Sequence, residues 1–442
     1  MKPVFMSTVI LFALSGVVFP LWAEDSQRTH TVKKGEALYL IAKKYGCSAD
    51  EIWAVNQDTI RRKTKIFPGQ VLDIPDDCTG KKIKVVKKDG KTPKSTPRIS
   101  EKKGRCRDCR WKEKYIDSRK LKKAMKEMGF TAPKGFRALI VKTTLTKDKK
   151  KILRHDLYDY GGNAADYRGW NPASTIKLFS GVSALERIRD LGFSPKAKVT
   201  FHYKKGDKTF AMEDLYEDAV HLSKNIEHNR LVQLAGFDFL NGKKGTLKRA
   251  GLDFSYVIKG YELSAWEAEG HSKYLKCNPK ITVREGKRKK TIKARCSKAR
   301  YPCGSSACTS LSDLARMMCG LMLHEQLPRD KRLRLGSGSR QGKHLLFVRR
   351  KLNRKRKGKK DAVWDVLEKH FIPKKQRKNP VKGGYQLFRK AGFSQGWLSE
   401  NMYIYLPHGR VRWIVSLAAH DGRDGLTEAA DVIARIIKEG KL

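Results

Sequence analysis

Hydrophobic spacing divides the chain into two patterned zones and one unpatterned zone. Residues 29–76 carry a compact pattern of apolar and polar positions, and regular apolar spacing returns from about Tyr115 to Leu442. Between them, residues 77–114 are rich in lysine with scattered glycine, proline and serine, which predicts a solvated, self-repelling linker. We therefore expect two folded domains, over 29–76 and 115–442, joined by a basic linker.

The first zone predicts a strand–helix–helix–strand unit. A short strand and a turn cover 29–35, and a helix over 36–45 places its apolar residues on one face. Ser48 and Glu51 have the spacing of a capping box, which predicts the start of a second helix. Alternating apolar residues over 66–75 predict the second strand. Such a unit can close a small two-layer core.

The second zone mixes helical and strand patterns, which predicts an α+β domain. The expected elements are a helix over 118–128, strands over 136–141 and 152–160, a helix from Ser174, strands over 401–406 and 411–418, and a terminal helix carrying Leu426, Ala430, Ile433 and Ile437. A helix capped by Ser310 carries a mostly apolar sequence and is expected in the core.

The N-terminus predicts export. Lys2 precedes an apolar stretch over 9–19, and Ala23 precedes an acidic pair, which together are typical of a secretory signal over 1–23 cleaved after Ala23. An uncleaved anchor is the alternative. No later apolar run approaches the roughly 20 residues of a membrane-spanning helix, so a polytopic membrane protein is excluded. We expect a location in the periplasm, the cell wall or the extracellular space.

The charge balance points to anionic surroundings. Lysine and arginine number 96 against 45 acidic residues, a formal net charge of +51. For an exported chain the expected partners are wall polymers and lipid head groups, and nucleic acid becomes the minor alternative. Two basic insertions, 271–308 and 338–360, are interpreted as solvated loops. The alternative is a surface that steers the protein onto an anionic wall or membrane.

Nine cysteines fit an oxidising compartment. Cys106 and Cys109 form a lone CxxC motif without further zinc ligands nearby, so a local disulfide is expected and no metal site is predicted. Further disulfides are expected between Cys277 and Cys296 and between Cys303 and Cys308. Because the number of cysteines is odd, one thiol is left over, and Cys319 is the candidate because it lies on an apolar helix face.

Three motifs in the second zone carry candidate chemistry. Ser174 and Lys177 are three residues apart at a predicted helix start, so their side chains share one face. A serine hydroxyl becomes nucleophilic when a base takes its proton, and a lysine that burial or a second cation keeps uncharged can be that base. Alone, this pair more often indicates a capping serine and a solvated lysine. A Ser223-x-Asn225 motif and a Lys390-x-Gly392 motif follow in order.

The first zone closely resembles a LysM domain. The resemblance rests on His30–Glu36, Leu40–Gly46, Asn56 and Pro68–Gln70. It implies binding of N-acetylglucosamine chains in peptidoglycan or chitin. The implied groove consists of two loops, with the residues Gly35, Glu36, Ala37, Leu38, Ile66, Phe67, Pro68 and Gly69. The alternative is that these residues only shape turns.

The ordered set S-x-x-K, S-x-N and K-x-G resembles that of penicillin-recognising serine enzymes, the class A β-lactamases and D,D-peptidases. The resemblance implies an antiparallel sheet flanked by helices. It makes Ser174 the nucleophile, Lys177 its base or proton relay, Ser223 the residue that passes the proton to the leaving nitrogen, and Asn225 a hydrogen-bonding partner of the substrate's acyl side chain. Lys390 would help to bind the substrate carboxylate, and the backbone N–H groups of Ser174 and Phe393 would form the oxyanion hole.

Two positions depart from this family pattern. Ala391 stands where the family usually has a hydroxyl residue that contacts the substrate carboxylate. Class A β-lactamases also carry a Glu with an Asn four residues later, which positions the deacylating water. None of the glutamates between Asn229 and Thr309 has this partner, and Glu262, Glu267 and Glu269 are the remaining candidates. The missing pair favours a peptidase over a β-lactamase.

The leading hypothesis is an exported acyl-serine hydrolase, held at the wall by its LysM domain, that acts on D-alanyl-D-alanine stem peptides or β-lactams. No cofactor is expected. The alternative is a wall-binding protein whose serine-enzyme domain is a catalytically idle scaffold. The choice between peptidase and β-lactamase stays open.

Overall fold

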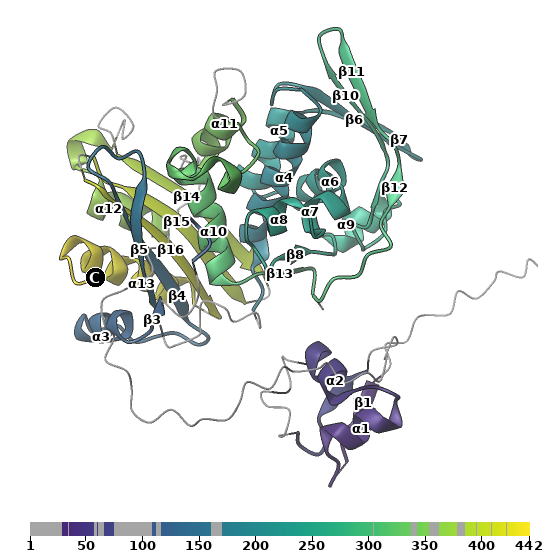
Figure 1. The fold of residues 1–442 in the computed structure, drawn as a ribbon, viewed down its shortest axis with the longest axis horizontal. Helices are drawn as coiled ribbons and strands as arrows, with labels where there is room; N and C mark the ends of the chain where they lie inside the picture. Colours follow the sequence, from purple (N-terminus) through teal and green to yellow (C-terminus); the bar gives the residue numbers. More distant parts are fainter. Residues whose placement is uncertain are drawn as a thin grey trace, which may run out of the picture. The chain divides into compact units, whose positions relative to one another are not determined.

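The structure is a computed structural model, shown in Figure 1. It describes residues 29–33, 35–56, 60, 66–74, 108–111, 116–160, 170–303, 305–336, 343–352, 362–377, 385–394, 396–407, 409–420 and 422–442. The chain divides into two compact units, with the boundary at Lys94 and Ser95. The predicted signal over 1–23 and most of the predicted linker lie outside the described residues.

The first unit has the predicted βααβ order. Strand β1 (Thr29–Thr31) pairs antiparallel with β2 (Val71–Asp73), and helices α1 (Leu38–Lys44) and α2 (Ala49–Val55) lie between them in sequence. The capping box is confirmed, because the Ser48 hydroxyl accepts from the backbone N–H of Glu51 while the Glu51 carboxylate accepts from that of Ser48.

The core of the first unit is small and apolar. Leu38, Ile41, Ile52 and Leu72 are at most 3% exposed. The Asn56 side chain ties the end of α2 to the second strand, since its amide donates to the carbonyl of Asp73 and its oxygen accepts from the N–H of the same residue. The same amide donates to the carbonyl of Ile52 in α2, so one side chain satisfies two backbone groups of the strand and one of the helix.

The second unit is built on a six-stranded sheet with the order β14-β15-β16-β4-β5-β3. All neighbouring strands are antiparallel except β3 and β5, which are parallel. The strands are β3 (Ile116–Asp117), β4 (Arg137–Leu145), β5 (Ile152–Asp159), β14 (Gln386–Ser394), β15 (Trp397–Tyr405) and β16 (Val411–His420). The predicted mainly antiparallel sheet is therefore present, and β14 is one of its two edge strands.

Helices cover both faces of this sheet (Figure 1). One face packs on α3 (Lys120–Glu127), α12 (Ala362–Phe371) and α13 (Arg423–Lys438), and the other packs on α10 (Leu311–Met322) and the helices around α4 (Lys177–Asp190). Neighbouring residues of β4 alternate between the two cores: Ala138 and Ile140 belong to the first, Leu139 and Val141 to the second. The predicted α+β architecture is confirmed.

Most of the remaining elements lie in or around the second core. These are η2 (Ala173–Ile176), α5 (Met212–Tyr216), η3 (Glu217–His221), α6 (Asn225–Ala235), α7 (Phe237–Asn241), α8 (Thr246–Arg249), β8 (Tyr256–Val257), α9 (Leu263–Ala268), β9 (Cys277–Asn278), β12 (Arg295–Cys296), β13 (Ala307–Cys308), η4 (His324–Gln326), η5 (Arg329–Lys331) and α11 (Lys343–Leu352). A further turn, η6 (Lys374–Gln376), follows α12. No helix of the described residues is long and apolar enough to cross a membrane.

The basic insertion over 271–308 is not a solvated loop. Strands β10 (Lys280–Glu285) and β11 (Arg288–Ile292) form a hairpin that joins β6 (Lys198–Tyr203) and β7 (Gly206–Ala211) in a four-stranded sheet. The loop interpretation is wrong because Ile281 and Val283 alternate with the charged residues and are fully buried. In the sequence, the many neighbouring lysines and arginines made this alternation of apolar residues hard to recognise.

The second basic insertion is also ordered where it is described. Residues 343–352 form α11, so the loop interpretation is wrong for this part of 338–360. Arg349 pairs with Glu325 at 2.7 Å and donates to the carbonyl of Leu321, and Lys351 pairs with Glu217. Part of this charge is therefore used to attach the helix to the body of the unit.

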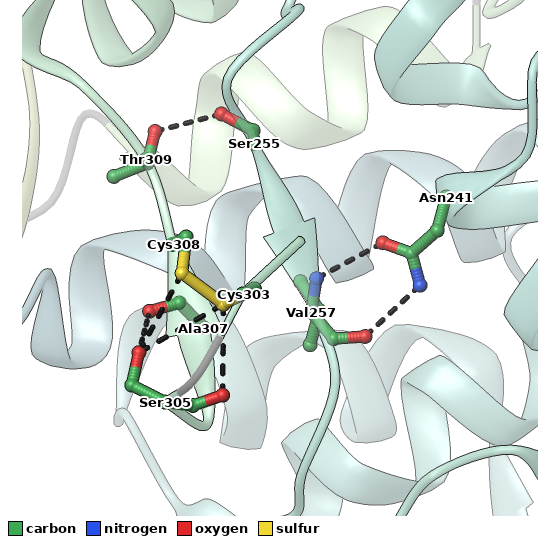
Figure 2. Close-up of a disulfide and its surroundings, with 8 residues drawn as sticks. All are labelled: Asn241, Ser255, Val257, Cys303, Ser305, Ala307, Cys308 and Thr309. Atoms are coloured by element: carbon green, nitrogen blue, oxygen red, sulfur yellow. Dashed lines mark hydrogen bonds between the residues drawn. A yellow bond between two sulfur atoms is a disulfide. The ribbon is translucent and has the colours of Figure 1, made fainter. Parts of the chain in front are cut away.

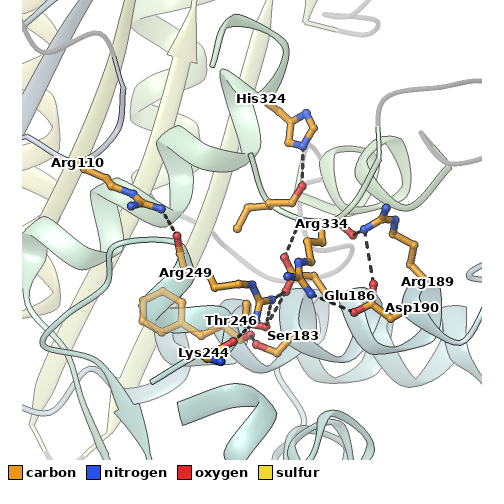
Figure 3. Close-up of polar contacts among 12 residues, drawn as sticks. Arg110, Ser183, Glu186, Arg189, Asp190, Lys244, Thr246, Arg249, His324 and Arg334 are labelled. Atoms are coloured by element: carbon orange, nitrogen blue, oxygen red, sulfur yellow. Dashed lines mark hydrogen bonds and ion pairs between the residues drawn. The ribbon is translucent and has the colours of Figure 1, made fainter. Parts of the chain in front are cut away.

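A buried carboxylate joins three segments of the second unit (Figure 3). Glu186 of α4 is 1% exposed and accepts a hydrogen bond of 2.6 Å from the Thr246 hydroxyl and another of 2.6 Å from the backbone N–H of Arg334. The Arg249 guanidinium completes the cluster. Every contact offsets the cost of burying the charge, so this cluster holds α4, α8 and the chain after α10 together.

The disulfides correct two predictions. Cys109 is bonded to Cys319, 210 residues away, so the local Cys106–Cys109 disulfide and the free Cys319 are both wrong. Cys109 and Trp111, which lie in the predicted linker, are 5% and 1% exposed in the second core. The apolar face of α10 that suggested a free thiol is the face against which this segment packs.

The two local disulfides occur as predicted. Cys277 is bonded to Cys296 and Cys303 to Cys308. Figure 2 shows the second of these beside the short β8–β13 pair, where Asn241 donates to the carbonyl of Val257 and accepts from its N–H, both at 2.9 Å. These contacts tie β8 to the end of α7.

Removing the long disulfide should cost far more stability than removing a short one. In the chain-entropy treatment, closing a loop of this length stabilises the fold by roughly 5 kcal/mol, and a five-residue loop by roughly 2 kcal/mol. We expect the Cys109→Ala/Cys319→Ala variant to lower the urea midpoint of the second unit about 2.5 times as much as Cys303→Ala/Cys308→Ala. Tryptophan fluorescence measures both transitions. Equal shifts would contradict the prediction.

Candidate active site

Ser174 and Lys177 lie at the junction of η2 and α4. The turn before them is fixed by side chains: Asn171 accepts from the N–H of Ala173 at 2.8 Å, and the Thr175 hydroxyl donates to the carbonyl of Pro172 at 2.5 Å. Ala173 has a φ of 48°, an unfavourable value for a residue other than glycine. The turn leaves Ser174 partly exposed and Lys177 fully buried.

The Lys177 amine contacts the second motif. Its Nζ donates to the carbonyl of Ser223 at 2.5 Å and to Oδ1 of Asn225 at 2.5 Å. Ser223 has a φ of 65°, another strained value, and α6 begins two residues later. The strained turn directs the Ser223 carbonyl to one lysine while its hydroxyl is free to meet another group.

That other group is the third motif. Lys390 on β14 is 4% exposed, and its Nζ donates to the Ser223 hydroxyl at 2.8 Å. The same amine donates to the carbonyl of Ala391 at 3.1 Å. Ser223 therefore bridges the two lysines, with its carbonyl on Lys177 and its hydroxyl on Lys390.

Gly392 brings the edge strand against the nucleophile. A Cβ at this position would lie 2.8 Å from the backbone nitrogen of Ser174, 2.8 Å from the carbonyl oxygen of Pro172 and 2.6 Å from the Ser399 hydroxyl. Only glycine permits this approach. The next residue, Phe393, is 61% exposed beside it. The structure thus brings Ser174, Lys177, Ser223, Asn225, Lys390 and Gly392 together, with Phe393 at the margin.

A neutral histidine lies beneath the lysines. His228 follows Asn225 by one turn of α6, is fully buried, and its Nδ1 is 2.8 Å from the Ser180 hydroxyl of α4. Burial first, and then the charges of Lys177 and Lys390, hold the pKa of His228 well below its usual range. A neutral His228 adds no positive charge below the two amines. The sequence analysis missed it, although its helical spacing from Asn225 was a usable signal.

None of the three candidate glutamates is seen to contact the nucleophile or its lysine. Glu262 and Glu267 are exposed, and Glu269 pairs with Arg230 at 2.8 Å. All three belong to α9 or to its ends.

The residue that lies beside Lys177 on this side is Tyr261. Its hydroxyl donates to the carbonyl of Ala173 at 3.0 Å, and its ring centroid is 5.7 Å from Nζ of Lys177. The Asn229 side chain clamps its backbone, accepting from the N–H and donating to the carbonyl, both at 2.9 Å. Burial raises the pKa of Tyr261, so the phenol stays protonated at neutral pH and cannot act as a base. No motif in the sequence pointed to this residue.

The two loops that form the predicted groove of the first unit lie close together. Gly69 donates to the carbonyl of Val32 at 2.8 Å, which joins the loop before β2 to the end of β1. Gly35 and Gly69 have φ values of 86° and 83°, so both shape turns. Phe67 is 57% exposed.

The predicted groove residues differ in their exposure. Leu38 is 3% exposed and belongs to the core, so its side chain is not on the surface, whereas Ala37 and Ile66 are partly exposed and Pro68 is exposed. The Glu36 carboxylate accepts from the N–H of Lys33 at 2.7 Å and lies 2.8 Å from Nε2 of His30. The pKa of Glu36 is lowered mainly by the backbone hydrogen bond from Lys33 and then by the hydrogen bond with His30. Within the described ranges no group of three metal-ligating side chains occurs.

Residues 30–75 match the LysM domain family, which confirms the prediction for the first unit. A comparison of the chain with curated proteins finds no match.

Three solved structures are similar to the chain at low identity. A class A β-lactamase from Bacteroides cellulosilyticus is 13% identical, with 73% of this chain and 95% of that chain covered and a TM-score of 0.43. PBP-A is 12% identical, with 73% and 97% covered and a TM-score of 0.40. A β-lactamase from Sphaerobacter thermophilus is 14% identical, with 73% and 96% covered and a TM-score of 0.41.

Proposed function

We propose that this protein is an exported acyl-serine enzyme that acts on D-alanyl-D-alanine stem peptides and on β-lactams, and that its LysM domain holds it on peptidoglycan. The observation that carries the proposal is the bridge made by Ser223. Three motifs that lie far apart in sequence meet through one residue, whose carbonyl accepts from Lys177 and whose hydroxyl accepts from Lys390. A scaffold has no need to bury two lysine amines around a serine.

The chemistry follows from these contacts. The Ser174 oxygen attacks the amide carbon, the carbon–nitrogen bond breaks, and the hydroxyl proton passes to the Lys177 amine, which must first have lost its own proton. The proton reaches the leaving nitrogen through the Ser223 hydroxyl, which Lys390 holds at 2.8 Å. The backbone N–H groups of Ser174 and Phe393 would stabilise the oxyanion, and such a donor typically contributes about 3–4 kcal/mol to the transition state.

A labelled penicillin tests the proposal. We expect one covalent label per chain, and peptide mapping should place it on the fragment that contains Ser174. A fold that serves only as a scaffold would take up no label. A label on any other serine would overturn the assignment.

Ala391→Thr should accelerate acylation. The alanine follows Lys390 and leaves the substrate carboxylate without a hydroxyl donor, and a hydrogen bond to a charged group contributes about 1.5–3 kcal/mol. We expect an increase of roughly 10-fold or more in the second-order acylation rate, measured by stopped-flow with a fluorescent penicillin. Ala391→Val, which adds similar volume without a hydroxyl, is the control. An equal gain in both variants would contradict a role for the hydroxyl.

The LysM domain should bind the wall without the rest of the chain. We expect a fragment of residues 24–78 to sediment with purified peptidoglycan in about 0.5 M salt, where non-specific charge attraction is screened, and chito-oligosaccharide to compete. Phe67→Ala should weaken binding, because Phe67 is a large hydrophobic residue of the proposed groove and is exposed. Val71→Ala removes an exposed side chain outside the groove and is the control. Loss of binding in high salt would reduce the domain to an electrostatic tether.

A further inference from the structure

The four-stranded sheet of β6, β7, β10 and β11 has one buried and one open face. Val199, Phe201, Ile281 and Val283 point into the core and are fully buried. Residues that alternate with them lie on the opposite side, which we call the cationic face. In Figure 1 the β10–β11 hairpin extends beyond the neighbouring helices, so its free end stands clear of them.

A row of three cations crosses the cationic face. Arg284 of β10 lies opposite Lys198 of β6 on one side and Lys289 of β11 on the other, and all three are exposed. No described carboxylate pairs with any of them. Like charges placed directly opposite one another in a sheet are destabilising. An unpaired row of three therefore costs stability that the fold itself does not recover.

Four threonines form the next row. Thr209, Thr200, Thr282 and Thr291 lie on the four successive strands in register. The Thr200 and Thr209 hydroxyls are 2.9 Å apart, and the Thr282 hydroxyl is 2.9 Å from Nε2 of His202. A line of hydroxyl groups thus runs parallel to the line of cations, about 7 Å away along the strands.

The third row makes the charge of the cationic face uneven, because it contains an acidic side chain. It contains Lys280, His202 and Asp207, and the Asp207 carboxylate lies 2.9 Å from Nδ1 of His202. The acidic group is therefore at the far edge from the cations. None of the exposed large hydrophobic residues of the protein's described part lies on these four strands. The face has no side chain that could anchor it in a bilayer.

We propose that the cationic face binds a single extended chain of a linear phosphate polymer. The three cations lie on adjacent strands, so they span about 10 Å in a straight line, which suits a strand-like ligand. Arg284 offers a fork of donors that matches phosphate oxygens, and threonine hydroxyls donate to the same oxygens. The lack of an apolar anchor favours a polymer over a lipid surface. This site is separate from the proposed catalytic serine.

Linear polyphosphate is the probe for this proposal, with the full-length protein. The triple variant Lys198→Gln/Arg284→Gln/Lys289→Gln should lower the affinity about 10²-fold at low salt, because each cation near an anionic surface contributes about fivefold. It should also reduce the slope of log affinity against log salt by about 2, since each neutralised phosphate releases about 0.7 counterion. Arg284→Lys keeps the charge and should still weaken binding.

A matched control separates a site from the overall charge. Lys122→Gln/Lys126→Gln/Lys438→Gln removes the same charge from exposed residues of α3 and α13. We expect this variant to bind polyphosphate almost as well as the wild type. An equal loss in both triple variants would overturn the proposal, because net charge alone would then explain binding. Unchanged penicillin labelling and thermal melting show that the variants fold.

Three other ligands test the chemistry of the partner. Polyglutamate of equal charge should bind more weakly than polyphosphate, and equal affinity would overturn the choice of phosphate. The triple variant of the cationic face is also tested with phosphatidylglycerol vesicles and with duplex DNA. If its affinity for the vesicles falls more than its affinity for polyphosphate, the face binds a membrane. If its affinity for DNA falls more, the face binds nucleic acid. Either result would overturn the polymer proposal.

Discussion

Replacing Ser174 by alanine is expected to abolish the covalent penicillin adduct. Replacing Lys177 by methionine, which keeps the length and the buried stem, should slow acylation by about 10²–10⁴-fold, because a positioned general base typically contributes that factor. The reason lies in the contacts of Lys177, whose amine is fixed by two acceptors and shielded from water. Intact-mass measurement of the adduct over time gives both results.

Lys224→Met is the matched control. Lys224 stands between Ser223 and Asn225, but its side chain is 52% exposed and pairs with Asp218. The substitution removes the same kind of side chain from the neighbouring motif, so it should leave the acylation rate within a factor of a few. An adduct that persists in Ser174→Ala, or an equal loss in both lysine variants, would contradict the proposed mechanism.

The β-lactam adduct of the wild-type protein should be long-lived. Hydrolysis needs a base that polarises water at the ester, and the residue beside Lys177 is Tyr261, whose pKa is raised by burial. With a typical turnover near 10 s⁻¹ and a loss of about 10²–10⁴-fold for the missing base, the adduct should last from seconds to many minutes. A peptide substrate should be released faster, because its smaller leaving group diffuses away. Decay of the adduct mass measures the rate.

Two variants of Tyr261 sharpen this test. Tyr261→Glu places a carboxyl group beside Lys177 and should speed the decay of the adduct. Tyr261→Phe keeps the ring, removes the hydrogen bond to Ala173, and should not restore hydrolysis. If the wild type hydrolyses a chromogenic cephalosporin many times per second, a base exists elsewhere. Glu262, Glu267 and Glu269 would then be the first residues to replace.

The parts that local spacing determines could be predicted from the sequence. Ser48 and Glu51 make the capping box expected of them, and Ser310 caps α10 by accepting from the N–H of Asp313. The motif lysines and serines meet because each motif lies at the start of a helix or on an edge strand, and the order of the motifs was visible. The twofold alternation of apolar residues likewise indicated the central strands.

The parts that depend on distant contacts could not be predicted in this way. The bond between Cys109 and Cys319 joins segments whose sequences contain no common pattern. The hairpin over 280–292 looked like a charge run because only Ile281 and Val283 show its buried side. Tyr261 reaches Ala173 through a clamp from Asn229, and neither residue type by itself suggests such a role.

The long disulfide also decides how a mechanical load would enter the second unit. If the first unit is fixed to a wall and the second is pulled, the tension travels along the chain to Cys109 and crosses directly to Cys319. Cys319 lies in α10, all of whose residues are buried between the sheet and the helices. The force therefore acts on the most deeply packed helix and cannot peel away the short strand β3 or helix α3, which follow Cys109 in sequence. Without this covalent bond, the same force would act first on β3 and α3 and would unfold the unit from that edge.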